Sequence, residues 1–394
     1  MTRGFERSTV RRVRTVDADQ HLFEPRTMWR DHIDPAFRDK ALAIEDDDLG
    51  WAHLTWQGKQ LTVAESQKPM RPQDLGDTWE MRQRGERSPE RYDDTVPPSY
   101  TDAAARLTAL DGWGLDAAVL FPNFGLIWED MLDDDVPAVC ANMRASNRWM
   151  ADIARDGQGR LHPVAHMTLR DADWAVAEIA NLDRAGIRLA MVGPSPVDGK
   201  PLSHPDLFRV WDAFCTHGVT PVFHVGGFVG PLHPVWYTAE TEPTDRLMDS
   251  VFLWVAPAVA LTNMITQGTF ERFPELRIGV VELSAHWIPQ FLMMLDGASE
   301  FYAQRRGGPL NALPERPSHY FKKHVRVSAL SYEMPGVLTK RIGDDMLMFG
   351  SDWPHSEGIE HPLHDYEHAV ASMPEPAREK VMSGNVQWLL RAES

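Results

Sequence analysis

Metal-binding residue types gather in two short stretches at opposite ends of the chain. Near the start, Asp19 and His21 are two residues apart, so both side chains would leave the same face of a strand. Glu24 follows His21 by three residues and could curl back over the same place. Near the end, Asp352 and His355 are also three residues apart. If the first and last strands are neighbours in a closed barrel, these side chains converge on one site.

Two further predicted strands end in candidate ligands. His224 closes the fifth strand, and an imidazole nitrogen suits Zn, Fe and similar metals. Glu282 and His286 lie four residues apart after the sixth strand. We predict His286 as a metal ligand or the catalytic acid–base group, and Glu282 as a catalytic carboxylate that bridges metals or orients a ligand histidine. Asp17 shares the face of Asp19 but lies deeper, so Asp19 is the expected ligand.

The centre of the predicted site is a set of two carboxylates and two imidazoles, from Asp19, His21, His224 and Asp352. Such a set holds a divalent transition metal and leaves a position open for water, substrate or dioxygen. Asp352 is also expected to take a proton during catalysis. His166, at the end of the third strand, is a reserve ligand.

Composition narrows the class of protein. The chain has 394 residues and a formal net charge of −17, and such an acidic protein repels nucleic acid and anionic lipid. No apolar run reaches the ~18 residues of a membrane span, and the first residues lack the apolar core of a signal peptide. Cys140 and Cys215 fall in helical patterns, as reduced core residues do. We therefore predict a cytoplasmic protein without nucleic-acid or membrane partners.

Short apolar runs alternate with longer amphipathic stretches along most of the chain. Strands that alternate with helices pair in parallel, and continuous apolar strands are buried on both faces. We predict the α/β class and a single (β/α)8 TIM barrel over residues 1–394, because an open doubly wound sheet would not bring the ligand-bearing strand ends together. The predicted strands end near Asp17, Phe121, Met167, Val192, His224, Glu282, Leu330 and Phe349. The predicted helices cover 101–113, 137–156, 171–185, 205–217, 246–273, 286–304, 333–342 and 375–391.

Residues 26–100 interrupt this alternation after the first strand. They contain a predicted hairpin over 54–63 with Gln57-Gly58 at its turn, followed by a polar stretch. An insertion at this point lies over the C-terminal face of a barrel, where such enzymes keep their sites. The sequence is compatible with three roles for this segment: a lid, an oligomer contact, or an insertion without a function of its own. The long connection 225–250 would overhang the same face.

The chain resembles the amidohydrolase-2 branch of the amidohydrolase superfamily over nearly its whole length. The motifs that carry the resemblance are Asp19-x-His21-x-x-Glu24-Pro25, Pro221-Val-Phe-His224, Phe273-Pro-Glu-Leu-Arg-x-Gly-Val-Val-Glu282 and Gly350-Ser-Asp-Trp-Pro-His355. The branch includes decarboxylases of aromatic or unsaturated acids that hold one Zn or Mn. The resemblance implies that Asp19, His21, His224 and Asp352 are the ligands of that metal.

Two departures from the decarboxylases point to a different member of the branch. His355 stands where they tend to carry an aromatic residue, and Glu24 with Pro25 adds a signature that they lack. The fourth strand, 189–193, also lacks the lysine or glutamate that bridges the metals of dinuclear hydrolases. The surplus ligands resemble those of the dinuclear non-haem iron hydroxylases of the platensimycin pathway and of 2-aminoisobutyrate.

Three functions follow from these patterns. The favoured one is a dinuclear Fe or Fe/Mn monooxygenase that uses dioxygen to hydroxylate an unactivated C–H bond of a small carboxylic acid or natural-product intermediate, with the second metal on Glu24, His286 and His355. The alternative is a mononuclear Zn- or Mn-dependent decarboxylase or hydrolase of a carboxylic acid, with His286 as general acid or base. The third is a barrel that serves as a partner subunit; a homo- or hetero-oligomer of barrels is expected in any case.

Overall fold

Eight parallel strands form one sheet, as the alternating pattern predicted. The computed structural model describes residues 14–63, 80–132, 134–226, 236, 248, 250–308, 313–355, 358 and 361–392. The strands follow one another in chain order around the sheet, each parallel to the next. They are β1 (Val16–Leu22), β5 (Ala117–Pro122), β6 (Leu161–His166), β7 (Leu189–Met191), β8 (Thr220–His224), β9 (Ile278–Val281), β10 (Val325–Ala329) and β11 (Leu347–Phe349).

Alternate residues of each strand pack into two different hydrophobic cores, one inside the barrel and one between the strands and the helices. In β5, Val119 and Phe121 point into the barrel, whereas Ala118 and Leu120 pack outward in the larger core shared with the helices. Leu389 and Val386 of α17 (Asn385–Leu389) join the inner core. Both faces of the strands are therefore buried, which explains why their sequences are continuously apolar. The (β/α)8 barrel prediction is confirmed.

The ring closes between the first strand and the segment that follows the last one. The amide of Asp352 donates to the carbonyl of Asp19 over 2.8 Å, and the amide of His21 donates to the carbonyl of Trp353 over the same distance. Asp17 accepts hydrogen bonds from the amide and hydroxyl of Ser351 at 3.0 and 2.6 Å. Because β11 is short, this loop rather than a long ladder brings the two ends of the chain together.

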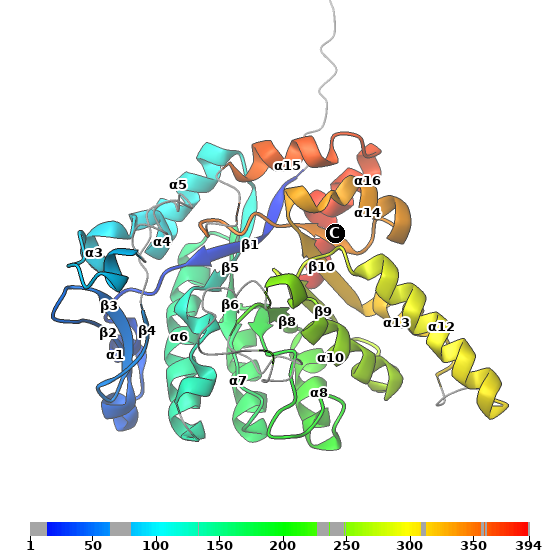
Figure 1. Ribbon diagram of the computed structural model, residues 1–394, viewed down its shortest axis with the longest axis horizontal. Coiled ribbons are helices and arrows are strands. Elements are labelled where there is room, and N and C mark those ends of the chain that lie inside the picture. The colour runs from blue at the N-terminus through cyan, green and yellow to red at the C-terminus, as the bar shows by residue number, and fades with distance from the viewer. Residues whose placement is uncertain are drawn as a thin grey trace, which may run out of the picture.

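Helices cover the outside of the barrel (Figure 1). Acidic side chains begin three of them, since Asp102, Asp135 and Asp171 each accept a bond from an amide in the first turn. α5 ends at Gly114, which is in the left-handed conformation. The predicted helices correspond to α5 (Ala103–Trp113), α6 (Val136–Asp156), α7 (Ala172–Arg184), α8 (Phe208–His217), α10 (Val255–Thr266), α11 (Thr269–Arg272), α12 (Ile288–Arg306), α14 (Pro335–Ile342), α16 (Glu375–Glu379) and α17.

Two barrel helices were not predicted. They are α13 (Pro317–His324) and α15 (Pro362–Val370). Both are short, with eight and nine residues, and an apolar pattern of this length does not identify a helix. None of the described helices combines the length and the apolarity that crossing a membrane requires.

The described part of the insertion forms a small antiparallel sheet against the flank of the barrel. β2 (Leu42–Asp46), β3 (Ala52–Trp56) and β4 (Lys59–Val63) pair in this order, and the hairpin turns at Gln57-Gly58 as predicted. Asn142 of α6 bonds the amide of Leu42 and the carbonyl of Lys40, which holds the sheet beside that helix (Figure 1). Residues 64–79 lie outside the described residues, so a lid or oligomer contact stays a prediction.

Candidate metal centre

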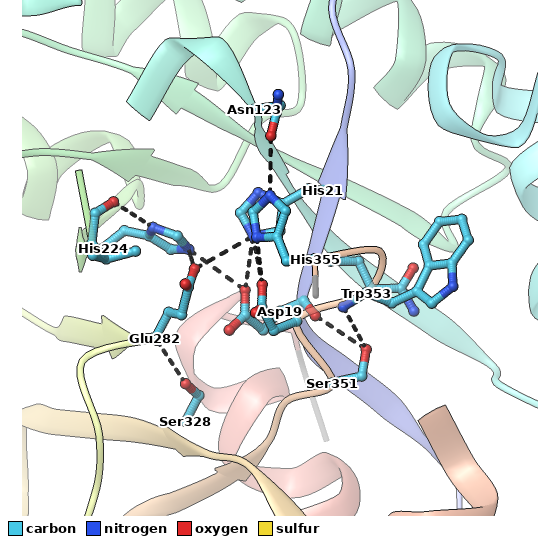
Figure 2. A network of polar contacts seen from close by, with 12 residues as sticks. Asp19, His21, Asn123, His224, Glu282, Ser328, Ser351, Trp353 and His355 are labelled. Carbon is cyan, nitrogen blue, oxygen red and sulfur yellow. Dashed lines mark hydrogen bonds and ion pairs between the residues drawn. The ribbon is translucent and has the colours of Figure 1, made fainter. Parts of the chain in front are cut away.

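Six side chains from four strand ends converge at the C-terminal mouth of the barrel (Figure 2). They form two overlapping groups with donor atoms within 4.8 Å of one another. The first is Asp19, His21, His224 and Glu282, and the second is His21, Glu282, Asp352 and His355. Nε2 of His224 lies 3.5 Å from Asp19 Oδ1 and 3.2 Å from Glu282 Oε2. Nε2 of His21 lies 3.2 Å from Asp352 Oδ1. The predicted convergence of the first and last strands is confirmed.

The two strand histidines are fixed with the same nitrogen toward the centre. Nδ1 of His21 lies 3.3 Å from the carbonyl oxygen of Pro122, and Nδ1 of His224 lies 2.8 Å from that of Val225. A carbonyl only accepts, so each Nδ1 carries the hydrogen and each Nε2 keeps its lone pair for the centre. A ligand histidine commonly has its tautomer set in this way.

The centre contains buried polar atoms without hydrogen-bond partners. They are both carboxylate oxygens of Asp19, Nε2 of His21, Nε2 of His224, Oε2 of Glu282 and Oδ2 of Asp352. Buried polar groups are almost always paired, so a cluster of orphans requires a bound species. Two donors that share an ion at about 2.1 Å lie roughly 3–3.5 Å apart, which the separations here match. Carboxylates with imidazoles suit Mn, Zn or Fe, so these residues fit a divalent transition metal.

Two of the carboxylate residues, Glu282 and Asp352, have a strained backbone conformation. Glu282 and Asp352 have φ values of 54° and 55°, in the left-handed region that residues other than glycine seldom adopt. The amide of Glu282 donates to the hydroxyl of Ser328 over 3.1 Å, which helps to hold this turn (Figure 2). Strain of this kind persists where the surroundings fix it, and it concentrates at functional sites.

Burial and mutual charge shift the pKa values of this cluster. Burial raises the pKa of Glu282 to about 7, and the neighbouring Asp352 adds to the rise. Burial alone would lower the pKa of His21, but the neighbouring carboxylates of Asp19, Asp352 and Glu282 raise it well above the ordinary value. A proton on His21 would thus compensate the crowded carboxylates, and a divalent cation would compensate them further.

His355 reaches the cluster but is occupied by two oxygens. Its Nδ1 lies 2.8 Å from Asp352 Oδ1, and its Nε2 lies 3.0 Å from Oδ1 of Asn123 (Figure 2). Burial and the nearby His21 lower the pKa of His355, but Asp352 and Glu282 outweigh them and raise it. Asn123 was not predicted, although a polar residue two positions after Phe121 at a strand end could have indicated it. The contacts favour a proton-bearing His355 over a bare ligand.

Glu24 does not enter either group of ligands. Its carboxylate accepts hydrogen bonds from the amides of Phe124 and Gly125 at 3.0 and 2.9 Å. The predicted helical turn after His21 does not form, because β1 continues to Leu22 and carries Glu24 toward the next loop. Glu24 thus contacts the loop after β5, and its role as a ligand of a second metal stays a prediction.

His286 also lies outside both groups. Its side chain is half exposed, and its Nδ1 is 3.2 Å from Oε1 of Glu333. No helix runs from Glu282 to His286, since α12 begins only at Ile288, so the predicted four-residue spacing does not place the two on one face. Glu333 was missed in the sequence, yet it is buried and accepts bonds from the hydroxyl of Ser284 and the amide of Ala285.

The remaining candidates also have defined positions. Asp17 bonds the closing loop and the side chain of Gln20 instead of pointing to the centre, as expected for the competitor of Asp19. His166 lies away from the ligands, in a cavity of about 430 Å³ that also borders His224. A side chain at Gly226 would meet the carbonyl of Leu126 at 2.3 Å, so this glycine permits a close approach between two loops.

Comparison with known proteins places this barrel in a family. The amidohydrolase family model matches residues 16–391. The chain belongs to the amidohydrolase family. No curated protein matches the sequence.

Solved structures share the amidohydrolase barrel over almost all of the chain. An amidohydrolase from Mycobacterium avium subsp. paratuberculosis K-10 has 23% identity and a TM-score of 0.75, covering 96% of this chain and 99% of its own. The 5-carboxyvanillate decarboxylase of Sphingomonas paucimobilis has 18% identity and a TM-score of 0.61, covering 96% and 99%. A dihydroxybenzoic acid decarboxylase from Polaromonas sp. JS666, solved with manganese and 2-nitroresorcinol, has 16% identity and a TM-score of 0.60, covering 96% and 97%.

Proposed function

We propose that this amidohydrolase is a mononuclear Mn- or Zn-dependent decarboxylase of a small carboxylic acid. The observation that carries the proposal is the set of orphaned donor atoms on Asp19, His21, His224, Glu282 and Asp352, which are enough for one ion. The names of two structural neighbours, both decarboxylases and one with manganese, support the same reaction class. The mononuclear alternative drawn from the sequence is thus better supported than the dinuclear oxygenase.

The ligand set that the oxygenase hypothesis assigned to a second ion, Glu24, His286 and His355, does not assemble among the described residues. Glu24 bonds the backbone, His286 bonds Glu333, and His355 is engaged by Asp352 and Asn123. A second ion in the other group would have to share His21 and Glu282 with the first. We therefore infer one metal per chain and a reaction that does not consume dioxygen.

In the proposed reaction the metal and the protein side chains have different roles. A bound divalent ion supplies Lewis acidity, which orients an acidic substrate and withdraws electrons from the carbon that loses its carboxylate. When the carbon–carboxylate bond breaks, its electron pair stays on the substrate carbon, carbon dioxide leaves, and that carbon takes up a proton. His355 is our candidate donor, because it bears a proton at Nδ1 against Asp352 Oδ1. Asn123 holds the other side of the ring, so the imidazole cannot turn away.

The test combines metal analysis with product detection. Protein loaded with Mn²⁺ or Zn²⁺ is incubated with a panel of hydroxylated and methoxylated benzoates and unsaturated acids. We expect about one ion per chain and release of carbon dioxide without oxygen uptake. His224→Gln should lose both the bound metal and the release of carbon dioxide. His204→Gln, which changes a partly exposed histidine outside the centre, should retain both properties.

Other products would contradict the proposal. Oxygen uptake together with two iron ions per chain would restore the oxygenase. Release of an alcohol or amine without carbon dioxide would indicate a hydrolase. Assembly into an oligomer of barrels stays a prediction, for which the sedimentation of the same preparation is the measurement.

A further inference from the structure

The cavity that borders His224 lies between the loops after three neighbouring strands. It has a volume of about 430 Å³, and its lining comes from the ends of β6, β7 and β8 together with the segment around Glu129. Leu126, Met167 and Val192 form part of its apolar wall. A substrate bound at the candidate metal centre would extend into this space, because His224 belongs to both.

His166 borders this cavity and carries an unused polar atom. The side chain is 4% exposed, and among the described residues its Nδ1 has no hydrogen-bond partner. Asn147 holds its backbone from both sides, through the amide at 2.8 Å and the carbonyl at 3.1 Å. The ring packs edge-on against Trp128 with centroids 5.1 Å apart. The imidazole is thus fixed in place before any ligand arrives.

The same ring is neutral. Burial lowers the pKa of His166 to about 3, so it carries no charge at physiological pH. A neutral imidazole has one donor and one acceptor nitrogen, which suits a hydroxyl, an amine or a carbonyl. An unpaired buried nitrogen is unfavourable, and a ligand that pairs it recovers that loss.

Acidic side chains dominate the charges of the described cavity lining. Glu129, Asp130, Asp134 and Asp198 contribute carboxyl groups, and Arg170 contributes the one cation of that lining. Arg170 is not free for a substrate anion, since it pairs with Asp198 at 3.0 Å and Asp134 at 3.2 Å. Burial raises the pKa of Glu129 to about 7, but the other acids still leave the lining negative. A second carboxylate on the substrate would be repelled here.

We propose that this cavity selects acids whose end remote from the metal is an uncharged or cationic polar group, and that His166 hydrogen-bonds that group. The inference rests on the proposed function, since it takes the substrate carboxylate to be held at the metal. It deepens that function by excluding dicarboxylic acids from the substrate class. His166 is then a specificity-determining residue and takes no part in the chemistry.

Three rigid probes test the selection directly. They are para-hydroxymethylbenzoate, para-aminomethylbenzoate and terephthalate, which differ in the charge of the group opposite the carboxylate. Binding to the full Mn²⁺-loaded protein is measured by titration calorimetry, so no turnover is needed. We expect the neutral and cationic probes to bind at least about tenfold more tightly than terephthalate.

Two variants assign the preference to residues. His166→Phe keeps a ring against Trp128 but removes the hydrogen bond. It should weaken the binding of para-hydroxymethylbenzoate about 3- to 10-fold and leave the binding of unsubstituted benzoate unchanged. Asp198→Asn removes a negative charge and one partner of Arg170, so it should tighten the binding of terephthalate by a similar factor. The controls are His162→Phe, in the same strand but not in the cavity lining, and Asp212→Asn on the exposed side of α8.

The outcomes separate this inference from the proposed reaction. Terephthalate binding as tightly as the other two probes overturns the inference, as does a failure of all three to bind. Unchanged discrimination in both cavity variants overturns it as well. If the preference is found but no acid releases carbon dioxide, the decarboxylase proposal fails while the charge selection of the cavity stands.

Discussion

His355 and His286, two histidines that the sequence predicted at the candidate centre, differ in what they can contribute. His355 lies between a carboxylate and an amide oxygen, with both nitrogens engaged inside the site. His286 is half exposed and pairs with Glu333 away from the ligands. The sequence predicted His286 as the acid–base group or a metal ligand and His355 only as a metal ligand, whereas their surroundings favour His355 as the acid–base group.

We expect opposite results for alanine at these two positions. His355→Ala should reduce turnover by about 10²–10⁴-fold with metal content preserved, because it removes the proton donor but none of the orphaned ligand atoms. His286→Ala should change turnover by less than about tenfold. Steady-state rates with metal analysis of both variants make the comparison. A severe loss in His286→Ala with normal folding would return the acid–base role to that residue.

Glu24 provides a residue-scale test of stability. In Glu24→Gln one of the two carboxylate oxygens is replaced by an NH₂ group, which faces a backbone amide donor. We expect a loss of about 1–3 kcal/mol in the free energy of unfolding, because a buried donor is left unpaired. Urea denaturation measures this loss, and metal stoichiometry should stay the same. A variant of unchanged stability that no longer binds metal would show that Glu24 is a ligand after all.

At the scale of elements, the important contact is the closure of the barrel. Ser351 donates to Asp17, and the next residue in the chain is the ligand Asp352. Arg106 of α5 supports the same seam by donating to the carbonyl of His21 and to the side chain of Gln20. Side chains outside the ligand set thus determine the positions of the ligands on β1 and on the loop after β11.

Ser351→Ala should therefore weaken metal binding. Residues that orient ligands typically contribute a factor of about 10–100 in metal affinity, and we expect a loss in this range. Competition with a chromophoric chelator measures the dissociation constant. Thr108→Ala is the control, because it removes an exposed hydroxyl of α5 that bonds only within its own helix. Equal affinities in the two variants would mean that the loop holds its position without Asp17.

Helix α13, absent from the sequence prediction, gives a pH-dependent test. Its last residue, His324, is buried beside Phe270, and burial lowers its pKa from 6.5 to about 4. Between these values the unfolded chain binds a proton that the folded chain does not, so folding stability falls as the pH drops from about 6.5 to 4. His324→Gln should flatten this part of the profile in urea denaturation midpoints. Parallel profiles would show that folding does not lower the pKa of His324.

Over the whole molecule, the sequence was informative wherever periodicity decides structure. Eight apolar strands, four of them followed by metal-ligand residues, predicted both the barrel and the meeting of Asp19 with Asp352, because parallel strands in a ring leave few alternatives. Spacing failed where the backbone leaves regular geometry. Glu282 and Asp352 depend on left-handed turns, and the position of His286 depends on a loop, which residue spacing cannot foresee.

The whole fold should respond to the metal, since the centre joins both ends of the chain. Without a cation, the carboxylates of Asp19, Glu282 and Asp352 crowd together, and binding relieves this repulsion. An ion at 100 times its dissociation constant should add about 2.7 kcal/mol to the free energy of unfolding. Chelation should therefore lower the denaturation midpoint, and Mn²⁺ should restore it. His224→Gln, which lacks one ligand, should show little or no shift. Saturation at two ions per chain, with stabilisation in two steps, would contradict the single-metal centre.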